Sequence, residues 1–190
     1  GKDGKVQRWD PVSGIAVGKP LSKSGNPVSS IAFSSNSKQF AFGVHDGSVQ
    51  LWAATGKKPL HTLEGHTDRV TSVAFSPNGK WLASAAMDGA VRLWSADQGT
   101  SLGEPLLGHR GKVLSITFSP NGKWLASAGS DGTVRMWDST SGRNLDESLF
   151  GHYKEEFSGV AFSRDGKWLT SGDSDGTVWL WDLVSGSNRG

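Results

Sequence analysis

The sequence predicts an all-β fold made of repeated units, and three observations lead to this prediction. Tryptophans recur at a nearly constant spacing, and each one closes a stretch of the form Asp-Gly-X-Val-X-X-Trp. Within a unit, hydrophobic and polar residues alternate with a period of two, which is typical of strands. The 3.6-residue period of an amphipathic helix is not found, so a fold without major helices is expected.

The repeat is long enough to fix the fold. Residues 70–94 align without a gap with residues 113–137 and match at 18 of 25 positions. The closing tryptophans lie 43, 42, 43 and 44 residues apart, and they are Trp9, Trp52, Trp94, Trp137 and Trp181. Units of this size cannot bury their hydrophobic faces alone, so neighbouring units are expected to stack.

Four short strands are predicted in each unit. In one unit they are VTSVAFS (70–76), KWLASAA (80–86), AVRLW (90–94) and an earlier segment at 58–65. SPNGK separates the first two and contains the Asn-Gly pair that favours a tight turn between antiparallel strands. Each unit is therefore predicted to form one four-stranded antiparallel sheet, and a ring of such sheets would leave only short edges.

Composition narrows the possible functions. The 190 residues are enough for a sizeable core, and the 26 glycines fit many turns. A net charge of +2 gives no reason to expect nucleic-acid binding. The absence of cysteine excludes disulfides, iron–sulfur clusters and cysteine nucleophiles, and it is compatible with a cytoplasmic location. No apolar run approaches the length of a membrane helix, so no membrane association is expected.

The units resemble the WD40-repeat β-propeller family. The resemblance rests on GHTDRV…DGAVRLW and GHRGKV…DGTVRMWD and covers essentially the whole chain. It implies four-stranded blades in which the first strand of each sequence unit completes the preceding blade. Residues 1–190 are then one propeller region, in which about 1–10 end a preceding repeat and 11–52, 53–94, 95–138 and 139–182 are full repeats.

The family usually has more blades than four, so an incomplete ring or a fragment is expected. Its strand edges would be open at Lys5–Trp9 and at Val178–Trp181. Unpaired strand edges favour association, and self-association through these edges is therefore possible.

The resemblance also implies a buried hydrogen-bonded network of Trp, Ser, His and Asp in each regular blade. Its members would be His66, Ser84, Asp88 and Trp94; His109, Ser127, Asp131 and Trp137; and His152, Ser171, Asp175 and Trp181. Ser, His and Asp also form hydrolase triads, but three copies of one set argue against a single active site. The first unit departs from the pattern, because Ser24 and Phe42 stand where His and Ser are expected.

No catalytic, cofactor-binding or metal-binding residue is expected. The segment DSDG (173–176) resembles the start of a calcium loop but lacks the later Glu, and sister units read GSDG and AMDG. A turn is therefore the better interpretation.

The leading functional hypothesis is a non-catalytic scaffold that binds proteins or peptides. In the family, partners contact positions beside the first Val of the inner strand and just before the network Asp. Here these are Arg69, Thr71, Met87, Lys112, Leu114, Ser130, Glu156, Ser158, Ser174, Pro27, Ser29 and His45. Arg69 and Lys112 would favour an acidic or phosphorylated segment. Two alternatives stay open: drift at exposed positions, and a sensor or regulatory segment of a signalling protein with an NTPase or kinase elsewhere.

Overall fold

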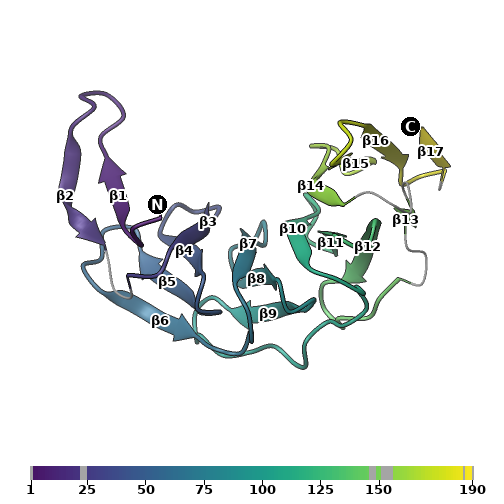
Figure 1. The fold of residues 1–190 in the computed structure, drawn as a ribbon. Helices are drawn as coiled ribbons and strands as arrows, with labels where there is room; N and C mark the ends of the chain where they lie inside the picture. Colours follow the sequence, from purple (N-terminus) through teal and green to yellow (C-terminus); the bar gives the residue numbers. More distant parts are fainter. Residues whose placement is uncertain (1, 22–24, 146–148, 151–155, 186, 190) are drawn as a thin grey trace.

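The chain forms an open arc of antiparallel sheets. A computed structural model describes residues 2–21, 25–145, 149–150, 156–185 and 187–189, and its regular structure consists of seventeen strands. Figure 1 shows the sheets side by side, with a two-stranded hairpin at one end of the arc and the last sheet at the other. The predicted all-β class is confirmed.

The sheets are named blades in chain order. The β1–β2 hairpin consists of β1 (Val6–Trp9) and β2 (Ala16–Leu21). Blade 1 contains β3 (Val28–Phe33), β4 (Gln39–Val44), β5 (Val49–Ala53) and β6 (Pro59–Leu63). Blade 2 contains β7 (Val70–Phe75), β8 (Trp81–Ala86) and β9 (Val91–Ser95). Blade 3 contains β10 (Val113–Phe118), β11 (Trp124–Gly129), β12 (Thr133–Asp138) and β13 (Leu149–Phe150). Blade 4 contains β14 (Phe157–Phe162), β15 (Trp168–Asp173), β16 (Val178–Asp182) and β17 (Ser187–Arg189).

Blades 1, 3 and 4 are each completed by a strand that follows their own third strand in the chain. In blade 1 the order is β3-β4-β5-β6, and β6 comes from the unit that goes on to form blade 2. Blades 3 and 4 have the same order, with β13 and β17 on their outer edges. The expected connection between successive repeats is therefore present.

Blade 2 departs from the predicted four strands. Its outer edge has only the isolated bridges Val91↔Leu106 and Trp94↔Ser101, so the prediction of a full fourth strand is wrong here. The segment contains Gly103, with a φ of +83°, and Pro105, which has no backbone N–H to donate. Both residues interrupt a regular ladder.

The expectation of an open edge is correct for β1 but wrong for Leu180 and Trp181 within Val178–Trp181. β16 pairs with β17 through Leu180↔Arg189 and Trp181↔Asn188, so a third-to-fourth strand pair forms there as in blade 1. β1, in contrast, pairs only with β2 among the residues that the structure describes.

Neighbouring blades pack through a repeated apolar interface. One blade contributes small residues from its second strand and two aliphatic residues from its third strand. The next blade contributes aliphatic and aromatic side chains from its first three strands. Between blades 2 and 3 the buried residues are Ala83, Ala85, Val91, Leu93 and Leu106 on one side and Val113, Ile116, Phe118, Leu125 and Trp137 on the other. This interface holds the strand ends, and the loops that they carry, in fixed positions.

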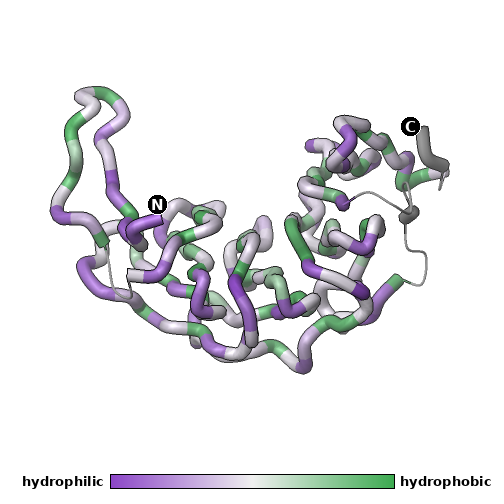
Figure 2. The backbone as a smooth tube through the Cα atoms, viewed as in Figure 1, coloured by the Kyte–Doolittle hydropathy of each residue, from purple (hydrophilic) through white to green (hydrophobic). Residues whose placement is uncertain are grey.

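Hydropathy follows the same arrangement. Figure 2 shows hydrophobic residues along the stacked strands, and it also shows them along the β1–β2 hairpin, which projects from the end of the arc. Val12 and Ile15 in this hairpin are exposed, as is Val184 in the turn that follows β16. Within the described ranges, no helix is long and apolar enough to span a membrane.

Candidate functional site

The predicted network is complete in blade 3. Trp137 Nε1 donates to Ser127 Oγ over 2.9 Å, and Ser127 Oγ lies 2.7 Å from Nε2 of His109. His109 Nδ1 lies 3.1 Å from Oδ1 of Asp131. The carboxylate also accepts the backbone N–H of Arg110 at 2.8 Å. The network thus joins β11, β12 and the turn between them to the loop that enters the blade.

Blade 2 has the same geometry. Trp94 Nε1 donates to Ser84 Oγ over 2.8 Å, and the same Oγ lies 2.8 Å from Nε2 of His66. His66 Nδ1 lies 3.0 Å from Oδ2 of Asp88. A carboxylate only accepts, so Nδ1 carries the histidine proton, and Nε2 accepts the serine hydroxyl. Every polar atom of the set is satisfied when the histidine is neutral.

Burial and hydrogen bonding favour these charge states. Burial lowers the pKa of His66 because it disfavours the charged ring, and the nearby carboxylate of Asp88 only partly opposes this. Burial alone would raise the pKa of Asp131, but hydrogen bonds from His109, Arg110 and Thr133 outweigh it and hold the pKa well below its ordinary value. In blade 2 the resting state is therefore a neutral His66 beside the carboxylate of Asp88.

The Ser-His-Asp sets are not accessible to a substrate. Ser84 and Ser127 are fully buried, and the side chains of His66 and His109 are also buried. Each serine hydroxyl already bonds to a tryptophan and a histidine within its blade. These sets therefore stabilise the blades and lack the exposed nucleophile that acyl transfer needs.

Blades 1 and 4 hold the closing tryptophan in different ways. In blade 4, Trp181 Nε1 donates to Ser171 Oγ over 3.1 Å, as predicted, whereas His152 lies outside the described residues. Asp175 accepts the backbone N–H of Thr177 at 2.9 Å, which places it in the turn. In blade 1, Trp52 Nε1 donates to Gln50 Oε1 over 3.3 Å, and this glutamine was not anticipated from the sequence.

Two further polar residues were missed by sequence reasoning. Asp173 at the end of β15 is buried and accepts Trp179 Nε1 over 3.0 Å. Asn26 Nδ2 donates to Oδ2 of Asp46 over 3.0 Å, close to where the histidine of a regular unit bonds its aspartate. The sequence signals are departures from the repeat: Trp179 stands where sister units have arginine, and Ser24 stands where histidine is expected.

The predicted partner-binding residues pair at one end of each blade. We call these positions the rim: they precede the first strand or follow the second strand of a blade. Backbone bonds join Met87 N to Arg69 O at 2.9 Å, Ser130 N to Lys112 O at 2.9 Å, and His45 N to Pro27 O at 3.0 Å. The structure therefore brings these six residues together as three equivalent pairs. Glu156 and Ser174 are exposed at the corresponding positions of blade 4.

The remaining predicted contact residues lie at the start of the first strand of each blade, and they are Ser29, Thr71, Leu114 and Ser158. Each occupies the position of a β-bulge at the start of the first strand. Thr71 Oγ1 donates to Val113 O of the next blade over 2.6 Å, and Ser29 Oγ bonds to Val70 O in the same way. Ser158 Oγ donates to Gly172 O within its own blade over 3.2 Å, and Leu114 has no hydroxyl. Thr71 and Ser29 thus have a structural role that the sequence did not indicate.

Arg69 makes the best-defined side-chain contact on the rim. Its Nη2 donates to Met87 Sδ over 3.2 Å, which holds the guanidinium above the end of β8. Burial, and next the positive charge of Arg69, lower the pKa of His45 on the neighbouring blade. Lys112, one blade further along, is exposed. Positive charge therefore lies at equivalent positions of two adjacent blades.

Within the described segments, no group of three or more His, Cys, Asp or Glu side chains is arranged to hold a metal ion. Asp173 and Asp175 instead accept the N–H of Thr177, which is the behaviour of a turn.

Comparison with protein families agrees with the geometry. The family model described as WD domain, G-beta repeat matches four segments of this chain, at residues 18–53, 57–95, 99–138 and 143–182. These matches cover most of the chain, and each contains the first three strands of one blade together with the segment that precedes them. The protein belongs to the WD40-repeat family, whose domains typically serve as protein-interaction scaffolds.

Proposed function

We propose that this chain is a non-catalytic scaffold that binds a protein or peptide at the rim, with Arg69 and Lys112 as its positive contribution. The observation that carries the proposal is the contrast between a repeated frame and a variable rim. The buried network is the same in blades 2 and 3, while the paired rim residues are Arg69–Met87 in one blade and Lys112–Ser130 in the next. Side chains that vary on a fixed frame are suited to recognition.

The chemistry of the rim favours an acidic or phosphorylated segment. Guanidinium and ammonium groups bind carboxylates and phosphates through charge-assisted hydrogen bonds, and two of them in adjacent blades can hold one extended ligand. Met87 beside Arg69 and Leu114 beside Lys112 add apolar surface for neighbouring ligand side chains. The exposed carboxylate of Glu156 would limit the patch on the side of blade 4. A cytoplasmic location remains a prediction from the cysteine-free sequence.

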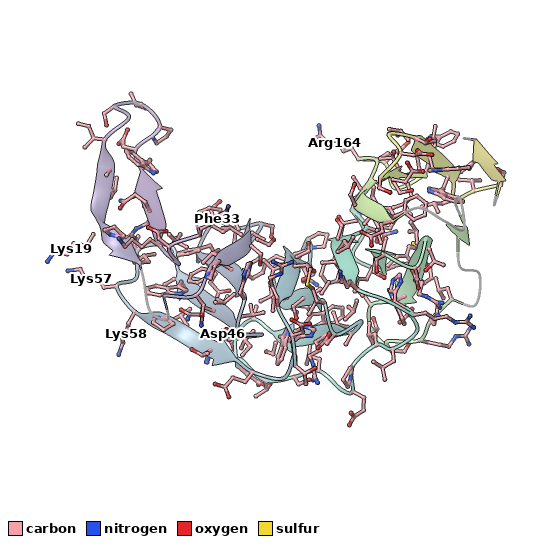
Figure 3. The ribbon with its side chains drawn as sticks, in the orientation of Figure 1. Lys19, Phe33, Asp46, Lys57, Lys58 and Arg164 are labelled. Atoms are coloured by element: carbon pink, nitrogen blue, oxygen red, sulfur yellow. The ribbon has the colours of Figure 1, made fainter. Side chains whose placement is uncertain are left out.

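A peptide array tests this proposal. Acidic and phosphorylated peptides are compared on the wild-type chain and on the Arg69→Ala, Lys112→Ala double variant, and the affinities of the peptides that bind are then measured at about 0.1 M salt. The matched control is Lys57→Ala, Lys58→Ala, which removes the same charge beside β6 on the outer side of the arc (Figure 3).

We expect binding about tenfold or more weaker in the rim variant and unchanged in the control, because each charge-assisted bond contributes on the order of 1.5–3 kcal/mol. Equal loss in both variants would show that net charge alone attracts the peptides. Full affinity in a folded rim variant would place the binding surface elsewhere.

A further inference from the structure

The outer edge of blade 2 is interrupted in its middle. Leu106 N donates to Val91 O over 2.7 Å, and Leu102 N donates to Leu93 O over 2.8 Å. Residues 103–105 lie between these two bonds, whereas a single residue lies between the corresponding strand pairs of blade 1. In Figure 1 the connection from β9 to β10 accordingly carries no arrow. The fourth strand of blade 2 therefore leaves the edge where that of blade 1 continues.

In blade 1 the regular fourth strand places the side chain of His61 against blade 2. His61 Nε2 lies 3.0 Å from Asp97 O in the turn after β9, and because a carbonyl group only accepts, Nε2 donates. The ring packs on Gly99 of the same turn, since the three atoms nearest to a Cβ on Gly99 would all belong to His61. The interface between blades 1 and 2 thus contains a planar ring that donates one N–H to the turn.

Blade 3 has the same turn after β12, but a different side chain lies against it. In both turns the glycine N–H donates to the carbonyl four residues earlier, so Gly142 and Thr140 are the equivalents of Gly99 and Asp97. Within the described ranges and apart from chain neighbours, the only atom within 4 Å of a Cβ on Gly142 would be Leu106 Cδ2, at 2.7 Å. No described donor bonds to Thr140 O. The ring of His61 therefore has no counterpart between blades 2 and 3.

A pocket of about 560 Å³ lies at this place. Trp81, Leu93 and Leu106 form apolar walls, and residues 139–142 of the turn form the facing wall. Trp81 begins β8, whereas the rim residue Met87 follows β8, so the pocket and the rim lie at opposite ends of the blade. Among the described residues that line the pocket, Glu104 alone is charged, and it is exposed. The pocket therefore combines apolar walls, a carbonyl acceptor and one negative charge.

We propose that this pocket binds a small heteroaromatic amine, whose ring N–H donates to Thr140 O and whose ammonium group pairs with Glu104. The ring lies against Gly142, in the place that His61 takes against Gly99 one blade earlier. Trp81 and Leu106 supply the apolar contacts that such a ring needs. The volume falls within the range of small-molecule sites, about 300–1,000 Å³. This site is independent of the proposed binding of proteins or peptides at the rim.

The test compares three probes that share one skeleton. Tryptamine carries both the ring N–H and the ammonium group. 1-Methyltryptamine lacks the N–H, and indole-3-propionate has a carboxylate in place of the ammonium group. Each probe is titrated into the 190-residue chain, and NMR follows the indole N–H signal of Trp81, which is assigned with Trp81→Phe.

Two matched pairs of variants locate the site. Glu104→Gln removes the charge at the pocket, and its control Glu64→Gln removes an exposed carboxylate from the connection between β6 and β7. Leu102→Ala removes part of the apolar wall, and its control is Leu60→Ala. Leu102 and Leu60 are both exposed, and each lies eight residues after the closing tryptophan of its blade.

We expect tryptamine to shift the Trp81 signal and to bind with a Kd of about 1 mM or lower. Affinity should fall at least about threefold with 1-methyltryptamine, with indole-3-propionate, with Glu104→Gln or with Leu102→Ala, and it should be unchanged in the two controls. No binding, or equal affinity for tryptamine and 1-methyltryptamine, overturns the proposal. Tighter binding of the blocked peptide acetyl-Gly-Trp-Lys-Gly-amide also overturns it, because a partner protein then supplies the ring.

Discussion

Thr71 on β7 and Val113 on β10 join two blades through one hydrogen bond, from Thr71 Oγ1 to Val113 O over 2.6 Å. The same hydroxyl also donates toward Ala85 O at 3.0 Å, so it bridges two carbonyl groups at the β-bulge. The bond supplements the apolar packing between blades 2 and 3 at the end of the strands that carries the rim. It therefore connects the interior of the arc to the proposed binding surface.

Thr71→Val is expected to lower the free energy of unfolding by about 1 kcal/mol, because the substitution keeps the shape but removes the hydroxyl that bonds to two carbonyl groups. The measurement is chemical denaturation followed by tryptophan fluorescence. Leu114→Val is the control at the equivalent position of blade 3, where no hydroxyl exists to be lost. An equal effect of both variants would mean that side-chain packing, rather than the hydrogen bond, is responsible.

His109→Ala is expected to destabilise the chain by on the order of 1–3 kcal/mol, because it leaves Ser127 and Asp131 without their shared partner in a buried site. His61→Ala serves as the control, since His61 bonds to Asp97 O at an exposed position. Thermal melts of the two variants and the wild type make the comparison. If the melting temperature of His109→Ala equals that of the wild type, the network does not stabilise the folded chain.

Stability is expected to decrease as the pH falls below about 6.5. The pKa of His66 is lower in the folded chain than in the unfolded chain, so the unfolded chain binds the extra proton more readily. The contribution of His66 is complete above its unfolded pKa and is lost as the pH falls through its folded pKa. Asp88 and Asp131 also have lowered pKa values, so a second decrease is expected below their ordinary value of 3.8.

Urea unfolding at a series of pH values measures both decreases. His66→Asn should flatten the first decrease, because asparagine does not titrate, while the decrease below pH 3.8 should remain through Asp131. A stability that rises as the pH falls from about 7 to about 5 would contradict the inferred neutral state of His66.

Much of this structure could be predicted from the repeat. The predictable features are those that involve only residues within one repeat unit. The strands of blade 2 and the bonds from Trp94 and Trp137 to their serines fall where the sequence places them. These features depend on local alternation and on residue types that recur at constant spacing. The resemblance to the WD40 family, rather than the alternation, pointed to the rim residues Arg69 and Met87, which the structure brings together.

The features that could not be predicted depend on neighbours in space. The bond from Thr71 to the next blade needs the inter-blade spacing, which one unit does not specify. The outer edge of blade 2 weakens through Gly103 and Pro105, although the other blades have a strand there. The bond between Asp173 and Trp179 arises where both residues differ from their counterparts, so the repeat itself carries no sign of it.

The isolated chain is expected to self-associate or to unfold at low temperature, because both ends of the arc expose apolar surface. Val178 is 67% exposed, although the equivalent Val91 and Val134 are fully buried, and Phe33 is exposed at the opposite end. Light scattering across a concentration series, combined with thermal melts, tests this. Val178→Lys with Phe33→Lys should reduce association. A compact monomer that melts cooperatively at high temperature would contradict the expectation.

Gly43 and Gly172 occupy equivalent positions on β4 and β15 but have opposite surroundings. A Cβ on Gly43 would lie 2.4 Å from Val70 Cγ1, inside the interface with blade 2, whereas a Cβ on Gly172 meets nothing within 4 Å. Gly43→Ala should therefore destabilise the chain by about 1–3 kcal/mol through overpacking. Gly172→Ala should be neutral or stabilise it by up to about 1 kcal/mol, because alanine restricts the unfolded chain. Denaturant unfolding of the two variants gives the comparison. If both change stability equally, the spacing between blades does not limit the size of these residues.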